Sequence, residues 1–218
     1  MKSENKNFIF DIDGVITSTD ELHYNAWKAT AKLVGINLKR KDNAQLRGVA
    51  RTQSLEFILK SYHKENEVSA QKFKELLIYK NKLYVDSLKQ LSEKDIYNGV
   101  KEVLEKIHQL GYKISLGSAS LNAPLILKQI GLDKYFDYKV DVSSVKTAKG
   151  TGELFALVAK DANSKNEDCY VIEDAQAGID GANVLGMHTI CYLTEENLTN
   201  CEYTIKNHQQ LLKLLNTL

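Results

Sequence analysis

The chain has 218 residues, of which 43% are hydrophobic and 26% charged, enough for one large domain or for a core with a modest second domain. The 29 basic residues balance 28 acidic ones, so the sequence lacks the positive charge expected of a nucleic-acid-binding protein. The first apolar run is too short for a signal sequence or a membrane span. We therefore expect a cytoplasmic protein, a monomer by default, with no nucleic-acid or membrane partner.

The first predicted element is a buried parallel strand over 7–12, a short apolar run that ends in carboxylates. From residue 98 onward, helix-like and strand-like stretches alternate. In chain order we expect a helix over 100–110, the strand KISLGSAS, helices over 124–130 and 153–162, the strand CYVIED, a helix over 178–185 and the strand HTICYL. This alternation predicts an α/β fold, a doubly wound Rossmann-like parallel sheet with ligands at the carboxyl ends of its strands.

Residues 17–91 interrupt this pattern. They contain three helix-like stretches and no convincing strand: Asp20 to Val34, Thr52 to Tyr62 and Ser69 to Leu91. We interpret this segment as an inserted helical cap domain, and residues 1–16 and 92–218 as the α/β catalytic core domain.

The three cysteines, Cys169, Cys191 and Cys201, are odd in number and widely spaced. This spacing argues against a metal knuckle and against a disulfide framework. Cys169 and Cys191 lie in strand-like runs, where we expect them to pack as small core residues.

Two acidic pairs follow predicted strands. Asp11 and Asp13 lie where the first strand meets a turn eased by Gly14, and the turn could bring both carboxylates to one pocket as nucleophile and proton donor. Glu173 and Asp174 end CYVIED, and such oxygen ligands suit Mg²⁺. Solvated aspartates at a strand end, and helix-start acids, remain the alternatives.

Two further segments carry phosphate-binding chemistry. Residues 118–122, Ser-Ala-Ser-Leu-Asn, lie between a predicted strand and a helix, where backbone N–H groups and a hydroxyl can cradle a phosphate or simply cap the helix. Lys149 precedes the next helix and could neutralise a phosphoryl oxygen, although a lysine in a loop usually faces solvent.

Read in order, DIDGV, SAS, Lys149 and ED resemble the four motifs of the haloacid dehalogenase-type phosphotransferase superfamily. Within it, DGVITSTDELHYNAW, LRGVARTQSL and EDAQAGIDGA resemble the β-phosphoglucomutase family. One departure is that the family usually follows its lysine with proline, where this chain has Gly150.

The resemblance implies that Asp11 becomes a phosphoaspartate while Asp13 protonates and deprotonates sugar oxygens. It implies Mg²⁺ as the cofactor, held by Asp11, the Asp13 carbonyl and Asp174, with Glu173 bound directly or nearby. The implied phosphate-binding residues are Ser118, Ala119, Ser120, Asn122 and Lys149. The implied substrate-binding residues are Thr19, His23, Trp27, Leu46, Arg47, Gly48, Val49, Arg51, Ser54 and Lys80.

Several of these positions have simpler interpretations. Arg51 could be a surface arginine at a helix start rather than a clamp for a second phosphate. Trp27 could be a core residue, and Lys80, which lies within an apolar helical stripe, could extend to solvent. Thr19 is expected at a hinge.

Three functions stay open at this stage. The first is interconversion of β-glucose 1-phosphate and glucose 6-phosphate through β-glucose 1,6-bisphosphate. The second is a Mg²⁺-dependent phosphatase for small sugar or polyol phosphates that uses the same Asp11 nucleophile. The third is a non-catalytic sugar-phosphate binder. In each case the partner is a small sugar phosphate.

Overall fold

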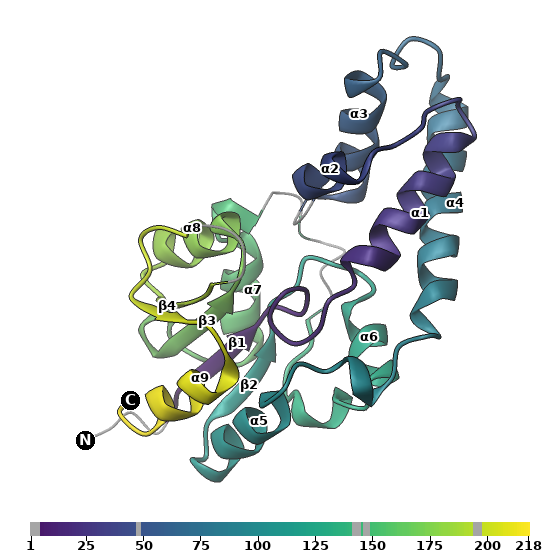
Figure 1. Cartoon of the computed structure of the whole chain (residues 1–218). Helices are drawn as coiled ribbons and strands as arrows, with labels where there is room; N and C mark the ends of the chain where they lie inside the picture. Colours follow the sequence, from purple (N-terminus) through teal and green to yellow (C-terminus); the bar gives the residue numbers. More distant parts are fainter. Residues whose placement is uncertain (1–4, 47–48, 141–144, 146–148, 194–197) are drawn as a thin grey trace. The chain divides into compact units, whose positions relative to one another are not determined.

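The computed structural model describes the chain except residues 1–4, 47–48, 141–144, 146–148 and 194–197 (Figure 1). It divides into two compact units. The first, which we call the core unit, comprises Met1–Ser18 and Ser92–Leu218, and the second, the helical unit, comprises Thr19–Leu91. The helical unit thus begins two residues after the boundary expected from sequence.

The core unit is built on one five-stranded sheet in the order β2-β1-β3-β4-β5. Every pair of neighbouring strands is parallel. The strands are β1 Asn7–Phe10, β2 Lys113–Leu116, β3 Cys169–Glu173, β4 His188–Tyr192 and β5 Tyr203–Ile205. Because the chain leaves β1 for β2 on one side and returns to β3 on the other, the strand order reverses at β1. Ligands of doubly wound sheets bind beyond the carboxyl ends of the strands at such a switch point.

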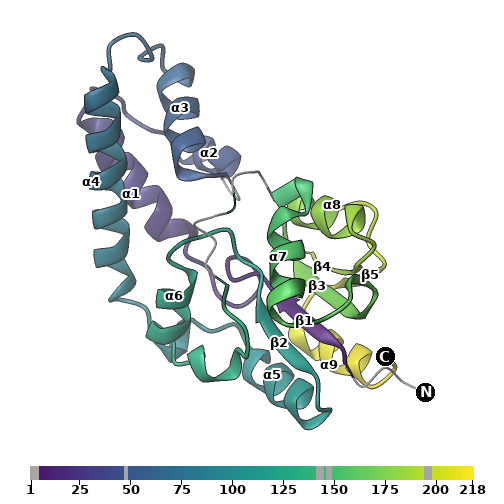
Figure 2. The same ribbon diagram turned by 180° about the vertical axis from the view of Figure 1, so that it is seen from behind.

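Helices cover both faces of this sheet, with α5 and α9 on one face and α7 and α8 on the other (Figures 1 and 2). The helices of the core unit are α5 Val100–Gln109, α6 Ala123–Gln129, α7 Glu153–Asp161, α8 Gln176–Val184 and α9 His208–Leu215. Its short 3₁₀ turns are η2 Glu93–Asp95, η3 Asp133–Tyr135, η5 Lys149–Thr151 and η6 Asn166–Asp168.

Side chains alternate between the two faces along the central strands, so they fill the apolar space on both sides of the sheet. Ile9 and Val171 point into a cluster with Phe155 and Val158 of α7, all fully buried. On the other face Phe8 stacks on Tyr170, with ring centroids 5.1 Å apart. A sheet buried on both faces explains why these strands are continuous apolar runs in the sequence.

The helical unit contains α1 Asp20–Lys32, α2 Arg40–Asn43, η1 Ala44–Leu46, α3 Arg51–Ser61 and α4 Ala70–Leu88. It has its own apolar core, in which Trp27 and Ala31 of α1 pack with Leu55 and Ile58 of α3 and Leu76 of α4. Ser69 begins α4, its side chain accepting a hydrogen bond from the backbone N–H of Lys72.

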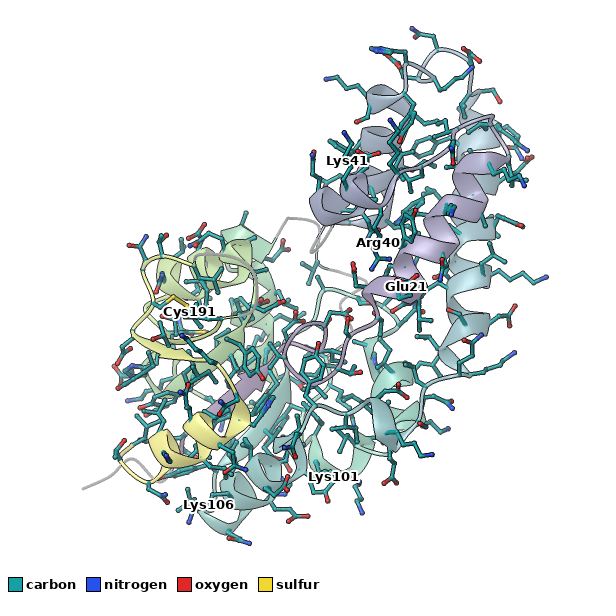
Figure 3. The ribbon with its side chains drawn as sticks, in the orientation of Figure 1. Glu21, Arg40, Lys41, Lys101, Lys106 and Cys191 are labelled. Atoms are coloured by element: carbon teal, nitrogen blue, oxygen red, sulfur yellow. A yellow bond between two sulfur atoms is a disulfide. The ribbon has the colours of Figure 1, made fainter. Side chains whose placement is uncertain are left out.

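The α/β fold class is confirmed, and most predicted elements end within a few residues of the observed ones. The sequence analysis missed α2, β5 and α9, which are short. In the helical unit, Arg40 of α2 forms an ion pair with Glu21 of α1 (Figure 3). Among the described residues, no helix is long and apolar enough to cross a membrane.

The interpretation of the cysteines is partly wrong, because Cys191 and Cys201 form a disulfide (Figure 3). β5 lies parallel to β4, so the chain must return beside β4 before β5 starts. The Cα atoms of residues 191 and 201 lie 5.9 Å apart. The backbone N–H of Glu202 also donates to Thr189 Oγ1 of β4, at 3.0 Å. Cys169 is a free, buried thiol as expected.

Candidate active site

The acidic residues of the core unit meet at the switch point of the sheet. Phe10 pairs with Ile172 across β1 and β3, and the backbone N–H of Asp11 donates to the Ile172 carbonyl at 3.1 Å. Asp11, Glu173 and Asp174 can each offer a carboxylate oxygen within 4.8 Å of the other two. Parallel pairing therefore brings together two motifs that are 162 residues apart in the sequence.

This carboxylate cluster suits a divalent cation. Asp11 is 6% exposed and Glu173 is 0% exposed, while Asp174 is partly exposed. Carboxylates held this close repel one another, and a cation bound among them removes that repulsion. Because the donors are all oxygens, they fit Mg²⁺ rather than a soft metal.

Two glycines make room for the cluster. Gly14 has φ +79°, and a Cβ at this position would overlap the Asp174 carboxylate. A Cβ at Gly178 would likewise overlap the Glu173 carboxylate. The absence of a side chain at each position lets the backbone approach the acids closely.

Glu173 has a second role at the start of α8. Its Oε2 accepts hydrogen bonds from the backbone N–H groups of Asp174 and Ala175, both at 3.1 Å. A carboxylate at a helix start is stabilised by the unpaired N–H groups there. Glu173 is therefore both a helix-start acid, as one interpretation of this acidic pair expected, and a member of the carboxylate cluster.

Asp13 begins a tight turn after β1. The Gly14 N–H donates to the Thr17 carbonyl and the Ile16 N–H to the Ile12 carbonyl, both at 2.9 Å. Asp13 is partly exposed. An extended strand would point Asp11 and Asp13 to opposite faces, and the observed turn ends the extended backbone at Asp13.

The segment after β2 lies beside the tip of β1, where the Gly117 N–H donates to the Phe10 carbonyl at 2.8 Å. Ser118 is 6% exposed and Ala119 is exposed. The Ser120 hydroxyl accepts from the Asn122 N–H at 3.3 Å, so local capping of this segment is observed. Lys149 begins η5, and its side chain lies outside the described part of the chain.

A second group of candidate residues meets inside the helical unit. Lys80 of α4 is 3% exposed, and its Nζ lies 2.8 Å from His23 Nδ1 of α1. The same ammonium lies 4.9 Å from the Trp27 ring centroid and 4.6 Å from that of Tyr84. Lys80 therefore does not extend to solvent, and aromatic faces stabilise its charge within the apolar stripe. We call these four residues the Lys80 cluster.

His23 is held neutral in this cluster. Burial, the Lys80 charge and the Arg51 charge lower the pKa of His23 to about 3. Because an ammonium can only donate, Nδ1 must accept the hydrogen bond from Lys80, which leaves the proton of the neutral ring on Nε2.

Three other expected substrate residues of this unit are at least partly buried. Thr19 is buried, and its hydroxyl lies 2.9 Å from the Tyr84 hydroxyl. Arg51 is the first residue of α3, is partly buried, and has a pKa lowered by burial. Ser54 is 2% exposed and donates to the Val49 carbonyl at 3.4 Å.

The remaining expected substrate positions differ in their exposure. Leu46 is 8% exposed and Val49 is 37% exposed. Trp27 is 2% exposed and belongs to the apolar core of the helical unit, so its interpretation as a packing residue holds. Arg47 and Gly48 lie outside the described residues.

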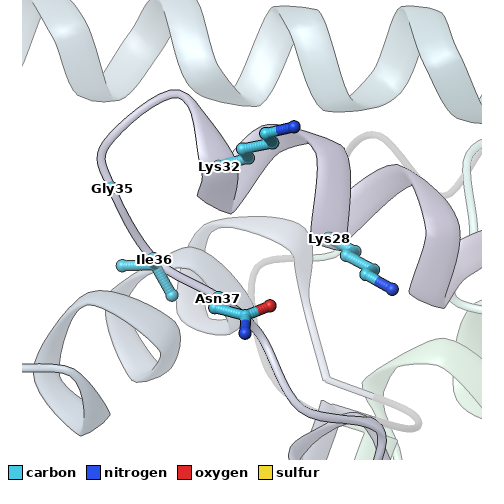
Figure 4. A pocket seen from close by; sticks show the side chains of 5 residues that line it. All are labelled: Lys28, Lys32, Gly35, Ile36 and Asn37. Carbon is cyan, nitrogen blue, oxygen red and sulfur yellow. The ribbon is translucent and has the colours of Figure 1, made fainter.

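A separate hollow of about 320 Å³ lies in the helical unit (Figure 4). It is lined by Lys28 and Lys32 of α1 and by Gly35, Ile36 and Asn37 of the segment that follows. No residue expected to bind substrate lines it.

The sequence analysis treated Tyr84 only as part of the apolar stripe of α4. In the structure its ring also lies 4.0 Å from the His23 ring and its hydroxyl reaches Thr19. A tyrosine rather than a phenylalanine at a buried stripe position was the available signal, because a buried hydroxyl needs a partner.

Comparison with known proteins places these motifs in a family. A model described as haloacid dehalogenase-like hydrolase matches residues 6–186. The β-phosphoglucomutase of Bacillus subtilis is 35% identical over 85% of this chain and 82% of its own length. A crystal structure of β-phosphoglucomutase from Clostridium difficile superposes with a TM-score of 0.90 at 34% identity, covering 97% of each chain. A phosphorylated carbohydrates phosphatase of Thermotoga maritima is 28% identical over 84% of this chain and 82% of its own. With the family model spanning most of the chain and the acidic motifs at the strand tips, this protein belongs to the haloacid dehalogenase-like hydrolase family.

Proposed function

We propose that this protein is a β-phosphoglucomutase. It would interconvert β-glucose 1-phosphate and glucose 6-phosphate through a phosphoaspartate on Asp11 and a β-glucose 1,6-bisphosphate intermediate. The observation that carries the proposal is that one chain contains both a largely buried carboxylate cluster, within the core unit, and a buried cation cluster, within the helical unit. The 35% identity to the Bacillus subtilis enzyme supports the same activity.

Asp11 is the proposed nucleophile because it is a buried carboxylate at the tip of the central strand. Its attack on phosphorus forms an acyl phosphate and expels a sugar oxygen. Asp13 would give that oxygen a proton, and it would later remove the proton from the hydroxyl that attacks the phosphoaspartate. The Ser118 hydroxyl and the Ala119 N–H would orient the phosphoryl oxygens, with Lys149 neutralising part of their charge.

Asp11, the Asp13 carbonyl and Asp174, with Glu173 beside them, would hold Mg²⁺. When bound, the ion neutralises the charge of the nucleophile and of the phosphoryl group. Glu173 also fixes the start of α8 through its two backbone hydrogen bonds.

A mutase must bind a second phosphate, because the bisphosphate turns round between the two transfers. We assign this role to the helical unit. Arg51 can bind phosphate oxygens in a bidentate way, and the Lys80 cluster offers a cation and the His23 Nε2–H donor. A phosphatase for small substrates has no such requirement.

The product decides between the two activities. The protein is incubated with Mg²⁺, β-glucose 1-phosphate and a trace of the bisphosphate, and glucose 6-phosphate and free phosphate are followed together. The proposal expects glucose 6-phosphate from the β-anomer and little from the α-anomer. Free phosphate released in step with substrate loss, without isomer, would replace the mutase by a phosphatase.

A matched pair of arginine variants tests the second phosphate site. Arg51→Ala should remove isomerisation while Asp11 can still be phosphorylated, since the core unit holds the reacting phosphate. Arg40→Ala, an arginine of the same unit that pairs with Glu21, should leave isomerisation unchanged. Equal isomerisation in both variants would remove Arg51 from the proposal.

The phosphatase remains the second candidate because a relative of comparable coverage, from Thermotoga maritima, is a phosphorylated carbohydrates phosphatase. Its chemistry differs only in the acceptor, because water then takes the phosphoryl group from Asp11.

A further inference from the structure

The turn after β1 is a closed loop of residues 12–17, which we call the Asp13 loop. The Ile12 carbonyl accepts a hydrogen bond from the Thr17 N–H at 3.2 Å. The Thr17 carbonyl in turn accepts from the Gly14 N–H at 2.9 Å, and Asp13 pairs with Thr17 in an isolated parallel β-bridge. Asp13 therefore lies within a loop whose two ends are bonded to each other.

Thr17 also ties the Asp13 loop to the segment where the chain returns to the core unit. It is 0% exposed, and its Oγ1 donates to the Asp95 carbonyl at 2.7 Å. Beside this bond, the Tyr97 N–H donates to the Ile16 carbonyl at 2.8 Å. Of these two bonds only that of Thr17 is made by a side chain, so it is the one that depends on the residue at that position.

The acceptor of the Thr17 hydroxyl is itself held in place. Asp95 is the last residue of η2, and its Oδ2 accepts from the Ser92 N–H at 2.8 Å and from the Ser92 hydroxyl at 3.1 Å. Capping of this kind stabilises the start of a helical turn. The Asp95 carbonyl is therefore a defined anchor for the Asp13 loop.

The side chain of Thr17 suits an anchoring role. A buried carbonyl that loses its donor cannot turn to water, so the bond between the Thr17 hydroxyl and the Asp95 carbonyl is costly to break. A β-branched side chain has few χ1 states, which limits the directions that the hydroxyl can take. Such a bond can fix the position of the backbone that carries it.

We propose that Thr17 is a positioning residue for Asp13: its hydroxyl holds the Asp13 loop at the Asp95 carbonyl, and the loop presents the Asp13 carboxyl group to the leaving oxygen. This inference rests on the proposed role of Asp13 as acid and base. That role is needed when the leaving oxygen is strongly basic, as in a sugar phosphate. It is dispensable for p-nitrophenyl phosphate, whose leaving group departs as a stable anion without a proton.

The test compares single-turnover phosphorylation of Asp11 by β-glucose 1,6-bisphosphate and by p-nitrophenyl phosphate. Thr17→Val keeps the shape of the side chain and loses the hydroxyl. It should slow phosphorylation by the sugar bisphosphate about tenfold and phosphorylation by p-nitrophenyl phosphate less than about twofold. Thr17→Ser keeps the hydroxyl and should restore most of the loss. A wild-type ratio of the two rates in Thr17→Val, or an equal loss in Thr17→Ser, would overturn the proposal.

Thr189→Val is the matched control. Thr189 is a threonine of β4 in the same unit, is 1% exposed, and accepts a hydrogen bond from the Glu202 N–H through its Oγ1 at 3.0 Å. Its replacement also removes a buried hydroxyl, so it should lower stability without changing the ratio of the two phosphorylation rates. The same change of ratio in both valine variants would show a general effect of destabilisation and overturn the proposal.

Hydrogen exchange gives a readout that does not depend on turnover. In Thr17→Val, exchange at the Gly14 amide, which donates to the Thr17 carbonyl, should become about tenfold faster. The amide of Val171 in β3 should stay protected. Unchanged exchange at Gly14 would overturn the inference.

The wild-type protein provides a test that needs no variant. If Thr17 joins the Asp13 loop to the segment over 95–97, the Gly14 and Tyr97 amides should open together, with the same dependence on urea. Exchange of the Gly14 amide at lower urea than that of Tyr97 would overturn the proposal. If neither phosphate ester phosphorylates the wild-type protein, the proposed function fails, and hydrogen exchange alone decides whether Thr17 holds the loop.

Discussion

The two units assemble their candidate residues in different ways. In the core unit, backbone pairing between β1 and β3 brings the acids together, and glycine backbone leaves room for them. In the helical unit, side chains from α1 and α4 meet in an apolar interior, and aromatic rings surround the cation. Topology therefore fixes the anionic site, whereas packing fixes the cationic one.

This difference explains what the sequence could predict. Strand tips are visible as apolar runs that end in polar residues, so the sequence pattern places both acidic pairs at strand ends. The family resemblance adds that Asp11 and Asp174 hold the same ion. Helical spacing also places Lys80 within the apolar stripe of α4. The spacing could not show that Lys80 contacts His23, because these residues are 57 positions apart and their contact depends on how two helices pack together.

Asp11→Asn should have the largest effect and should be confined to the chemistry of the core unit. Loss of the nucleophile is expected to reduce turnover of every phosphate ester by roughly 10⁴-fold or more. The free energy of unfolding should not fall, because one of three mutually repelling carboxylates is removed. Turnover and urea denaturation measured together check both statements, and substantial turnover by the variant would contradict the assignment.

Lys80→Met should reduce isomerisation, the activity we assign to the helical unit, and spare phosphorylation in the core unit. Losing a charged donor costs about 1.5–3 kcal/mol of binding free energy, so isomerisation is expected to fall roughly 10- to 100-fold. Stability should change little, because the gain from removing a buried charge offsets the loss of the hydrogen bond to His23 Nδ1. Phosphorylation of Asp11 by p-nitrophenyl phosphate should persist.

The control for this prediction is Lys82→Met, because Lys82 is an exposed lysine of the same helix. This variant should behave as wild type in every assay. If Lys80→Met loses isomerisation and phosphorylation to the same extent, the distinction between the two units is wrong.

The Cys191–Cys201 disulfide should contribute to stability and little to chemistry. A loop of this length, closed across a separation of 10 residues, is expected to add about 2–3 kcal/mol to the free energy of unfolding. Cys201→Ser should lose this amount, and wild-type protein treated with dithiothreitol should match it. If dithiothreitol destabilises Cys201→Ser as much as it destabilises wild type, the prediction is contradicted. Sequence spacing missed this pair because it depends on the return of the chain beside β4.

Acid should weaken the helical unit through His23. The native pKa is about 3, below the ordinary value of 6.5, so the unfolded state binds a proton first. The stabilisation is complete above about pH 6.5 and is lost as the pH falls toward 3. Between pH 7.5 and pH 5 we expect a loss of about 2 kcal/mol from this residue.

Urea denaturation at the two pH values measures this loss. His23→Gln should lose less free energy of unfolding between the two pH values than wild type does. His63→Gln, at an exposed histidine of the same unit, should lose as much as wild type. An unchanged pH dependence in His23→Gln would contradict the neutral state assigned to the imidazole.

The central claim is that Asp11 carries the phosphoryl group. Wild-type protein is mixed with Mg²⁺ and β-glucose 1,6-bisphosphate, quenched in acid and digested, and the peptides are mapped by mass spectrometry, with Asp11→Asn treated in parallel. The account predicts one phosphoryl group on Asp11 in wild type and none in the variant. A phosphoryl group on another residue, or the same label in Asp11→Asn, would contradict it.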